Sequence, residues 1–500
     1  MGNRFFWVVF ILSLMTVLII GFSLRSDMIS GESKTLPRTA FVHLFEWQWD
    51  DIARECETFL GPQGFAAVQI SPPNEHAVVA EQGFPWWQRY QPVSYKLQSR
   101  SGDRTQLANM IQRCHQAGVK VYADAVINHM TAQESGVGSA GTPFIRYHYA
   151  DLYQPSDFHS CDRNIRDYTN RDEVMNCQLV GLPDLKTSSP KVQQRIVEYL
   201  ISLLNLGVDG FRIDAAKHME SQDIAAILAL LDRQTTKEPY IYQEVIDPGN
   251  EAIKKTEYYP NGDVIEFEYG KKVGAKFMGI EGQTIAQLET LGESWGLMPS
   301  NKAIVFIDNH DKQRGHGGGG TYLTHQDPEL YDLANVFMLA FPYGYPQVMS
   351  SYRFTNSDQG PPADANGKTH PVYRGDQAFC FGEWVCEHRY TAIAPMIQFR
   401  NITTDTAVTH WWSNGNNQIA FGRGDKGFVV INREDTVLTH TFQTDLPQGT
   451  YCNILKSEVE RNRRTCGDRT QAIAVNAQGQ ATITALPMEA VAIHVGAKVS

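Results

Sequence analysis

The chain has 500 residues, which is more than one hydrophobic core usually supports, so more than one domain is expected. Its formal net charge of −11 argues against nucleic acid or an anionic membrane surface as a partner, and it fits a neutral substrate. Eight cysteines behind an apolar N-terminal run indicate an exported protein with disulfides.

The N-terminal run, residues 5–22, is apolar and follows Arg4, which is typical of an export signal. The run is longer than the ~7–15 residues of a signal-peptide core and close to the ~18–20 that span a bilayer. We predict that the segment is removed; a retained anchor with the rest of the protein outside the cytoplasm is the alternative. Residues 1–37 then comprise the signal or anchor and a polar leader.

Short apolar runs alternate with helical patterns along the body of the chain, which predicts a (β/α)8 barrel. The eight expected strands are residues 39–45, 66–71, 120–128, 208–214, 241–245, 263–267, 303–311 and 345–350. Between the third and fourth lies a long irregular segment, residues 129–184, rich in Gly, Ser and Asp. A segment of this length predicts a functional loop or a small inserted domain.

The fourth expected strand ends in a charged pair. Because side chains alternate along a strand, Arg212 and Asp214 should point to the same side, with the cation one layer beneath the carboxylate. On this stretch alone, a buried structural ion pair and a functional site are equally good interpretations.

Two further strands carry acids near their ends. Glu244 lies near the end of the run 241–245, and Asn309 and Asp311 should share one side of the run 303–311. Together with Asp214, three carboxylates would meet at one end of the barrel, and such groups resist burial unless chemistry or a metal uses them.

Beyond about residue 405 the pattern changes to short strands separated by turns, which predicts a separate all-β unit. The expected strands are residues 418–422, 427–432, 438–443, 471–476, 481–484 and 490–495. Nothing in this unit looks catalytic. Asn401 begins a glycosylation sequon just before it, which matters only in a glycosylating host.

Four segments resemble the signature regions of α-amylases, glycoside hydrolase family 13. They are residues 124–129 (DAVINH), 211–218 (FRIDAAKH), 244–247 (EVID) and 306–311 (FIDNHD). Residues 86–95 (WWQRYQPVSY) and 315–320 (GHGGGG) resemble the animal-type branch, which also occurs in some bacteria. The resemblance covers roughly residues 38–497 and implies a TIM barrel (domain A, residues 38–128 and 185–405), domain B (129–184) and a C-terminal β-sandwich (domain C, 406–500).

The resemblance also implies the catalytic groups. Asp214 is expected to be the nucleophile and Glu244 the acid/base of a retaining glycosidase, whose carboxyl groups lie about 5–5.5 Å apart. Asp311 is expected to be the third acid, which holds sugar hydroxyls and helps to keep Glu244 protonated.

Substrate contacts are expected from aromatic, histidine and charged side chains near these acids. We expect them at Trp86, Trp87, Tyr90, Gln91, His129, Arg212, Lys217, His218, Glu251, His310 and His316. The dense aromatics at 86–90 should be exposed and stack on sugar rings, although a local core would use the same residues. The glycine-rich run 315–320 suits a mobile lid and lacks the pattern of a phosphate loop.

A calcium site is implied by the resemblance at Asn128, Asp184 and the backbone carbonyls of Met175 and His218. Chloride-activated relatives hold the anion with residues equivalent to Arg212 and Asn309 and with a basic residue on the eighth strand. This chain has Gln347 there, which donates hydrogen bonds but carries no charge. We therefore expect activity without bound chloride.

The cysteine spacing suggests short closed loops at Cys161–Cys177 and Cys380–Cys386, and it leaves the connectivity open. The resemblance implies these two pairs and adds Cys56–Cys114 and Cys452–Cys466.

The function expected from this reasoning is a secreted, monomeric α-amylase that hydrolyses internal α-1,4 bonds of starch, glycogen and maltooligosaccharides. Two alternatives remain open. An amylase-like binding subunit of a transporter, anchored by its N-terminal segment, is disfavoured because all three acids are present. A transglycosylase or an α-glucosidase uses the same acids, but the double tryptophan, the glycine run and the C-terminal sandwich favour endo action on a long polymer.

Overall fold

A closed barrel of eight parallel strands forms the centre of the computed structural model, which describes residues 38–150, 152–460 and 465–499. The predicted signal or anchor lies outside these residues. Around the barrel the strands follow the order β1-β11-β10-β9-β8-β7-β3-β2. Their bounds are β1 Phe41–Leu44, β2 Ala67–Ile70, β3 Lys120–Ala125, β7 Gly210–Ile213, β8 Tyr240–Gln243, β9 Asp263–Ile265, β10 Ala303–Val305 and β11 Tyr345–Ser350.

All eight expected strands are present, and the predicted TIM barrel is confirmed. Several strands end earlier than expected, most clearly β10, which stops at Val305. Asn309 and Asp311 therefore lie in the segment after the strand, and the expectation that strand alternation places them is wrong. An apolar sequence continues through Ile307, but these residues are buried without extending the strand.

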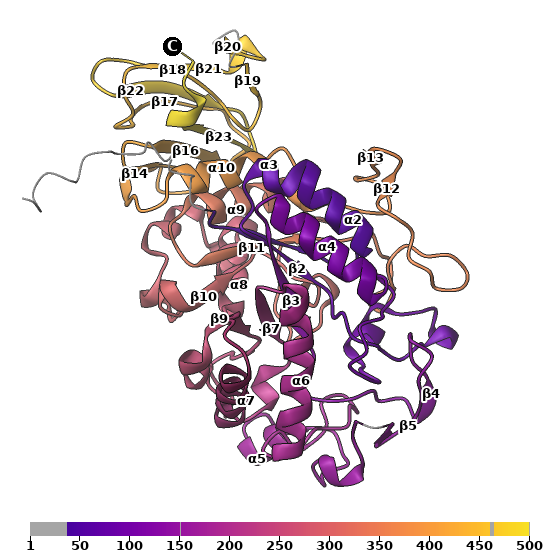
Figure 1. The fold of residues 1–500 in the computed structure, drawn as a ribbon. Coiled ribbons are helices and arrows are strands. Elements are labelled where there is room, and N and C mark those ends of the chain that lie inside the picture. Colours follow the sequence, from indigo (N-terminus) through magenta and orange to yellow (C-terminus); the bar gives the residue numbers. More distant parts are fainter. Residues whose placement is uncertain (1–37, 151, 461–464, 500) are drawn as a thin grey trace, which may run out of the picture. The chain divides into compact units, whose positions relative to one another are not determined.

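Helices follow the barrel strands and cover the outside of the barrel (Figure 1). The longer ones are α2 Trp49–Glu55, α4 Arg104–Gln116, α6 Pro190–Leu206, α7 Ser221–Gln234, α8 Phe267–Met278, α9 Pro328–Ala340 and α10 Ala394–Ile402, whereas the short α5 Arg171–Asn176 lies in the segment between β3 and β7. Asp103 caps α4 by accepting hydrogen bonds from the Thr105 and Gln106 amides. Gly207 ends α6 at a φ of +108°, a conformation that favours glycine, and the chain then enters β7.

Between β3 and β7 the chain forms a small three-stranded antiparallel sheet rather than further barrel strands. Its strands are β4 Ser135–Val137, β5 Pro143–Ile145 and β6 His148–Tyr149. Glu75 ties this segment to the barrel, because its buried Oε1 atom accepts hydrogen bonds from the Ala140 and Thr142 amides at 2.9 and 3.0 Å.

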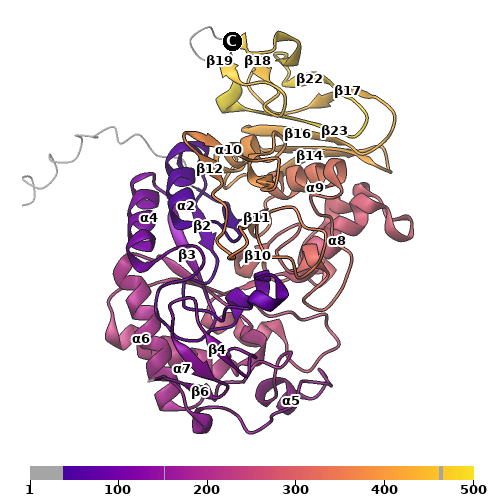
Figure 2. The same cartoon turned by 90° about the vertical axis from the view of Figure 1, so that its right-hand side faces the viewer.

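The C-terminal part is all-β, as expected, and packs on α9 and α10 (Figure 2). A four-stranded sheet has the order β14 Val408–Ser413, β15 Gln418–Arg423, β16 Gly427–Asn432 and β23 Glu489–His494. Further pairs are β17 Leu438–Gln443 with β22 Gln480–Ala485, β18 Gly449–Cys452 with β21 Ala472–Val475, and β19 Val459–Glu460 with β20 Thr465–Cys466. The short hairpin of β12 Tyr373–Arg374 and β13 Gln377–Ala378 lies in the loop after β11.

The glycosylation sequon is part of the core. Asn401 is 4% exposed; its Oδ1 atom accepts a hydrogen bond from Thr39 N at 2.9 Å, and its Nδ2 atom donates to Gly64 O at 2.9 Å. The folded chain thus has no free amide to offer a glycosylating enzyme at this position.

In the part of the chain that the structure describes, no helix combines the length and the apolar character needed to cross a bilayer.

Candidate active site

Arg212 lies at the centre of a buried cluster of carboxyl groups at the C-terminal ends of β3, β7 and β8. Its Nη1 atom is 2.7 Å from Asp124 Oδ1 and 2.8 Å from Asp214 Oδ1. Its Nη2 atom is 2.7 Å from Glu244 Oε1. Arg212 and Asp214 thus point to the same side, as the strand alternation predicted, and one cation faces three carboxyl groups.

Two opposing effects set the pKa values of these three carboxyl groups: burial and the positive charge of Arg212. Burial raises the pKa of Asp214 and of Glu244 to about 7 and that of Asp124 to about 6, and the Arg212 guanidinium opposes each shift. The negative charges of Asp214 and Asp311 raise the pKa of Glu244 further. Three carboxyl groups that face one guanidinium, two of them with a pKa raised to about 7, favour a shared proton near neutral pH.

A tight turn after β7 fixes Glu244. Its Oε2 atom accepts a hydrogen bond from the Ala215 amide at 2.8 Å, and Ala215 has a φ of +50°. That left-handed conformation is costly for a residue with a side chain, and it aims the amide at Glu244.

Asp311 lies at the start of a 3-10 turn, η11 (Lys312–Arg314), beyond the end of β10. Burial raises the pKa of Asp311, and the charges of Arg212, His316 and Lys312 lower it. Its Oδ2 atom is 3.7 Å from His310 Nε2. Asp311 therefore belongs to the electrostatic environment of the carboxyl cluster.

The aromatic residues beside the acids form a packed wall on the short helix η3 (Trp86–Tyr90). Tyr90 stacks on His310 with ring centroids 5.3 Å apart, and its hydroxyl donates to Asp124 Oδ2 at 3.0 Å. Trp86 is only 5% exposed and Tyr90 9%, so the expectation that these two rings are exposed is wrong. They pack edge to face against each other, at 5.8 Å, and Trp86 also meets Phe45, at 5.9 Å; Trp87 is half-buried.

Both ring nitrogens of His129 have partners within the protein. Nε2 donates to the Tyr90 carbonyl at 2.9 Å, and Nδ1 lies 3.3 Å from Asn128 Nδ2. Because a carbonyl only accepts, His129 carries its proton on Nε2, and burial lowers its pKa to about 4. Gln91 is likewise engaged, since its Oε1 atom accepts hydrogen bonds from Thr131 Oγ1 at 2.8 Å and Ala132 N at 3.0 Å.

The predicted contacts after β7 form a second group. Lys217 donates to the Ile246 carbonyl at 2.7 Å, pairs with Glu251 and lies 4.8 Å from the Tyr168 ring centroid. His218 Nδ1 is 3.3 Å from the Val174 carbonyl, and burial lowers its pKa to about 3. Both side chains are neighbours of the carboxyl cluster through the turn that follows Asp214.

The predicted calcium ligands lie where the irregular segment meets the barrel. Asp184 is 3% exposed, and burial raises its pKa to about 7. Hydrogen bonds from His159 and Asn128 lower this pKa, but by less than burial raises it. Asn128 Oδ1 is a buried oxygen without a hydrogen-bond partner. His218 contacts the carbonyl of Val174, the residue before Met175. The two residues whose backbone carbonyls are expected ligands, His218 and Met175, therefore lie in neighbouring segments.

These donors fit a hard cation, because an orphaned amide oxygen, a buried carboxylate and backbone carbonyls are the oxygen ligands that calcium takes. Within the described ranges no group of three or more His, Cys, Asp or Glu side chains is arranged to hold a metal. A site built mainly from amide and carbonyl oxygens does not need such a group.

Gln347 is part of an amide network inside the barrel. Its Nε2 atom donates to Gln69 Oε1 at 2.5 Å, and the same oxygen accepts a hydrogen bond from the Tyr242 hydroxyl at 2.7 Å. Gln347 is 5% exposed. Asn309 Oδ1 accepts from the Lys312 amide at 2.8 Å. The position where chloride-activated relatives carry a basic residue is therefore filled by a neutral side chain with a protein partner.

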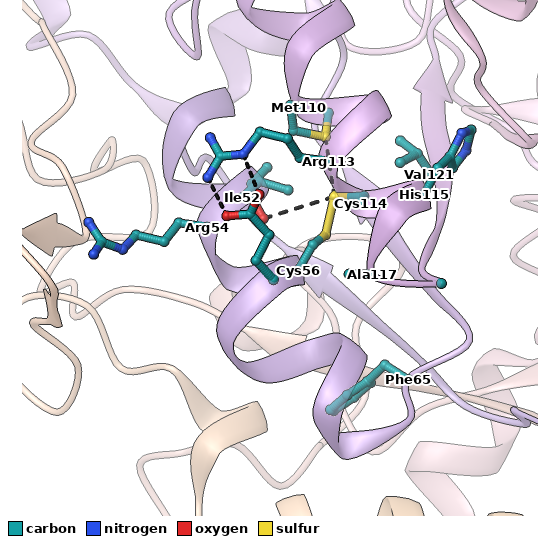
Figure 3. Close-up of a disulfide and its surroundings, with 12 residues drawn as sticks. Ile52, Arg54, Cys56, Phe65, Met110, Arg113, Cys114, His115, Ala117 and Val121 are labelled. Atoms are coloured by element: carbon teal, nitrogen blue, oxygen red, sulfur yellow. Dashed lines mark hydrogen bonds and ion pairs between the residues drawn. A yellow bond between two sulfur atoms is a disulfide. The ribbon is translucent and has the colours of Figure 1, made fainter.

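Four disulfides are present, with the pairing that the resemblance implies. They are Cys56–Cys114, Cys161–Cys177, Cys380–Cys386 and Cys452–Cys466. The first joins the end of α2 to α4 (Figure 3). The structure thus describes every cysteine as paired.

Sequence reasoning missed several residues of the site. Asp124 occupies an inward position of β3, and its alternation with the apolar neighbours was an available signal. Gln69, His159 and Lys312 gave no signal, because their roles depend on partners more than 20 residues away or on the conformation of a glycine loop.

Comparisons with known proteins agree with this geometry. The family model described as alpha amylase, catalytic domain matches residues 64–257, and the one described as alpha amylase, C-terminal all-beta domain matches residues 411–496. The chain is 46% identical to an alpha-amylase of Pecten maximus, over 92% of this chain and 93% of that protein. It is 45% identical to a pancreatic alpha-amylase of Rattus norvegicus, over 84% and 87%.

Solved structures give the same result. A mutant of alpha-amylase I from Eisenia fetida in complex with maltohexaose is similar with a TM-score of 0.87 and 44% identity, covering 92% of this chain and 97% of that one.

Proposed function

This chain belongs to the alpha-amylase family, glycoside hydrolase family 13, and on that premise we propose that it is a secreted enzyme that cleaves internal α-1,4 bonds of starch and glycogen with retention of configuration. The observation that carries the proposal is the pairing of Asp214 and Glu244 through one buried guanidinium. Two carboxyl groups in one environment, of which one keeps a proton near neutral pH, are what a retaining glycosidase needs.

Each acid has a distinct role in the proposed reaction. Asp214 attacks the anomeric carbon while Glu244 protonates the leaving oxygen; Glu244 then acts as the base that activates water to release the glycosyl group from Asp214. The Arg212 cation favours the ionised nucleophile, and Asp311 holds hydroxyl groups of the distorted ring. The remaining predicted contacts would bind the flanking sugars.

Calcium is proposed at Asn128, Asp184 and the carbonyls of Met175 and His218. The orphaned Asn128 oxygen and the buried Asp184 carboxyl support it. When bound, the ion supplies positive charge that ties the segment 129–184 to the barrel. His218 belongs to the same turn as Ala215, whose amide meets Glu244, so the ion would also steady the acid/base.

Activity is proposed to be independent of chloride. The Gln347 amide donates to Gln69, so the eighth strand offers an anion no positive charge at this point. Gln347 instead belongs to a neutral network with Gln69, whose Oε1 atom also accepts the hydrogen bond of the Tyr242 hydroxyl.

Secretion is supported by the apolar run 5–22 and by the four disulfides, which persist in oxidising compartments. We propose that the mature enzyme is a monomer with domain boundaries near residues 128, 184 and 405.

The proposal is tested by digesting soluble starch with the purified protein in calcium buffer, with and without chloride. Loss of iodine staining well ahead of the release of reducing ends, at equal rates in both buffers, is expected for an endo-acting, chloride-independent enzyme. Release of maltose or glucose without early loss of staining would contradict endo action, and a strong chloride response would contradict the role of Gln347.

A further inference from the structure

A glycine-rich segment, residues 315–320, passes close to the carboxyl cluster; we call it the glycine loop. Gly317, Gly318, Gly319 and Gly320 all have positive φ values, of +68°, +86°, +74° and +94°. Such a run has no side chains to anchor it, and its backbone loses more conformational freedom on ordering than that of other residues. A contact from outside the loop is needed to hold it in one conformation.

Lys312 provides that contact. Its side chain is 7% exposed, and its Nζ atom donates to the carbonyl of Gly319 at 3.0 Å and to that of Gly317. Both acceptors are backbone carbonyls of the glycine loop.

Two aromatic rings pack beside the ammonium group of Lys312. Lys312 Nζ is 5.0 Å from the centroid of Tyr322 and 5.4 Å from that of Phe267, and the Tyr322 hydroxyl donates to the Phe267 carbonyl at 3.0 Å. Ring faces attract a cation and cover its apolar stem, so Lys312 has one preferred position.

The glycine loop reaches from one wall of the site to the other. At one end, the His316 ring lies 5.8 Å from the Trp86 ring. In the middle, a Cβ at Gly317 would lie 3.3 Å from Ile246 and 3.5 Å from Asp311 Cβ, so the backbone is in close contact with both. Ile246 is itself held by Lys217. The loop therefore spans the space beside the catalytic acids.

We propose that Lys312 is a positioning residue that holds the glycine loop beside the catalytic acids, so that His316 is presented next to Trp86 for binding the glucan. The inference deepens the proposed function and rests on it for the substrate. The four glycines 317–320 have no side chains of their own, and one buried cation holds two of their carbonyls. Binding of the glucan should therefore depend on that cation more than the chemical step does.

The test compares Lys312→Met, which keeps the length of the side chain but has no donor, with Lys312→Arg, which keeps the charge and the donors. The matched control is Lys302→Met just before β10, which removes a lysine that also donates to a backbone carbonyl, that of Tyr259, at 3.2 Å. Hydrogen exchange is measured without substrate at the loop amides of Gly315 and His316, which donate to the Lys312 and Asp311 carbonyls at 3.3 and 3.0 Å, and KM and kcat are measured on maltoheptaose.

In Lys312→Met, exchange of the loop amides should be faster by about tenfold or more, and KM should rise about fivefold with kcat within about twofold of wild type. Lys312→Arg should restore most of the exchange protection and of the substrate affinity, and Lys302→Met should match wild type. Should Lys312→Met fold poorly, Lys312→Gln, which keeps an uncharged donor group on a shorter side chain, is expected to give intermediate exchange and KM.

Unchanged loop exchange in Lys312→Met, or an arginine variant no better than the methionine variant, would overturn the proposal. Faster exchange with an unchanged KM would also contradict it, because the loop would then not serve binding. If wild type fails to hydrolyse maltoheptaose, the proposed function fails, whereas the exchange measurement still decides whether Lys312 holds the loop.

Discussion

Around Arg212, the charge of each carboxyl group depends on the protons held by the others. Asp214, Glu244 and Asp124 all contact this one guanidinium, and burial raises the pKa of each. Burial makes it costly to ionise all three carboxyl groups at once, and the Arg212 charge makes it favourable to ionise some of them. The cluster can therefore hold one ionised and one protonated acid at neutral pH.

Asp214→Asn and Glu244→Gln should each lower kcat on starch by on the order of 10³-fold or more, because each removes a group that makes or breaks a bond in the proposed mechanism. Neither change leaves a new buried charge, so the melting temperature should not fall. Glu268→Gln on α8 is the control and should keep full activity. Near-normal activity of either variant would contradict its assigned role.

The pH dependence of kcat/KM should report the same cluster. Glu244 must be protonated when attack begins and burial raises its pKa to about 7, so activity should fall as the pH rises through that value. Arg212→Gln removes the cation that lowers the pKa of Asp214 and of Glu244, so both limbs of the profile should move to higher pH. Arg113→Gln, which breaks the exposed pair with Glu57, should leave the profile unchanged.

A shift of either limb to lower pH in Arg212→Gln would contradict this electrostatic account. The comparison uses maltoheptaose at equal calcium concentration, so that binding of the metal does not contribute to the difference.

Among the structural elements, the junction of α5, η5 (Ala216–His218) and the end of β3 carries the proposed calcium site. Excess chelator should lower the melting temperature by about 5–10 °C together with activity, and added calcium should restore both. In Asn128→Ala the melting temperature should no longer respond to calcium. An equal melting temperature with and without chelator would count against the site.

The barrel strands could be predicted from sequence because each is a short apolar run that ends in polar residues, and β11 matches its expected bounds, Tyr345–Ser350. Contacts between distant segments could not be predicted in this way. Asp311 was placed by extending strand alternation past Val305, where the chain has already left the sheet. The aromatic residues of η3 were expected to be exposed, but Trp86 is buried against Phe45 and Tyr90 against His310.

Hydrogen-bond partners from irregular segments could not be predicted from sequence patterns either. Family resemblance supplied Asn128 and Asp184, but His159, 2.6 Å from Asp184, comes from an irregular segment without a motif. Lys312 follows Asp311 directly but carries no motif of its own, because its two acceptors are carbonyls that only the conformation of the glycine loop brings to it.

At the scale of the whole molecule, the disulfides should contribute according to the length of chain that each closes. Cys56–Cys114 spans 58 residues and Cys380–Cys386 spans 6. Chain entropy predicts that removing the first costs about 4 kcal/mol of unfolding free energy and removing the second about 2 kcal/mol. Paired serine variants compared by denaturant midpoint test this; an equal loss in both would contradict the entropic account.

The stereochemistry of the first product tests the central claim most directly. Proton NMR of maltoheptaose hydrolysis, recorded before the sugars mutarotate, distinguishes the α from the β anomer of the newly formed reducing end. A double displacement through Asp214 and Glu244 predicts that the α anomer appears first and then equilibrates. If the β anomer appears first, Asp214 does not act as the nucleophile, and the proposed mechanism is wrong.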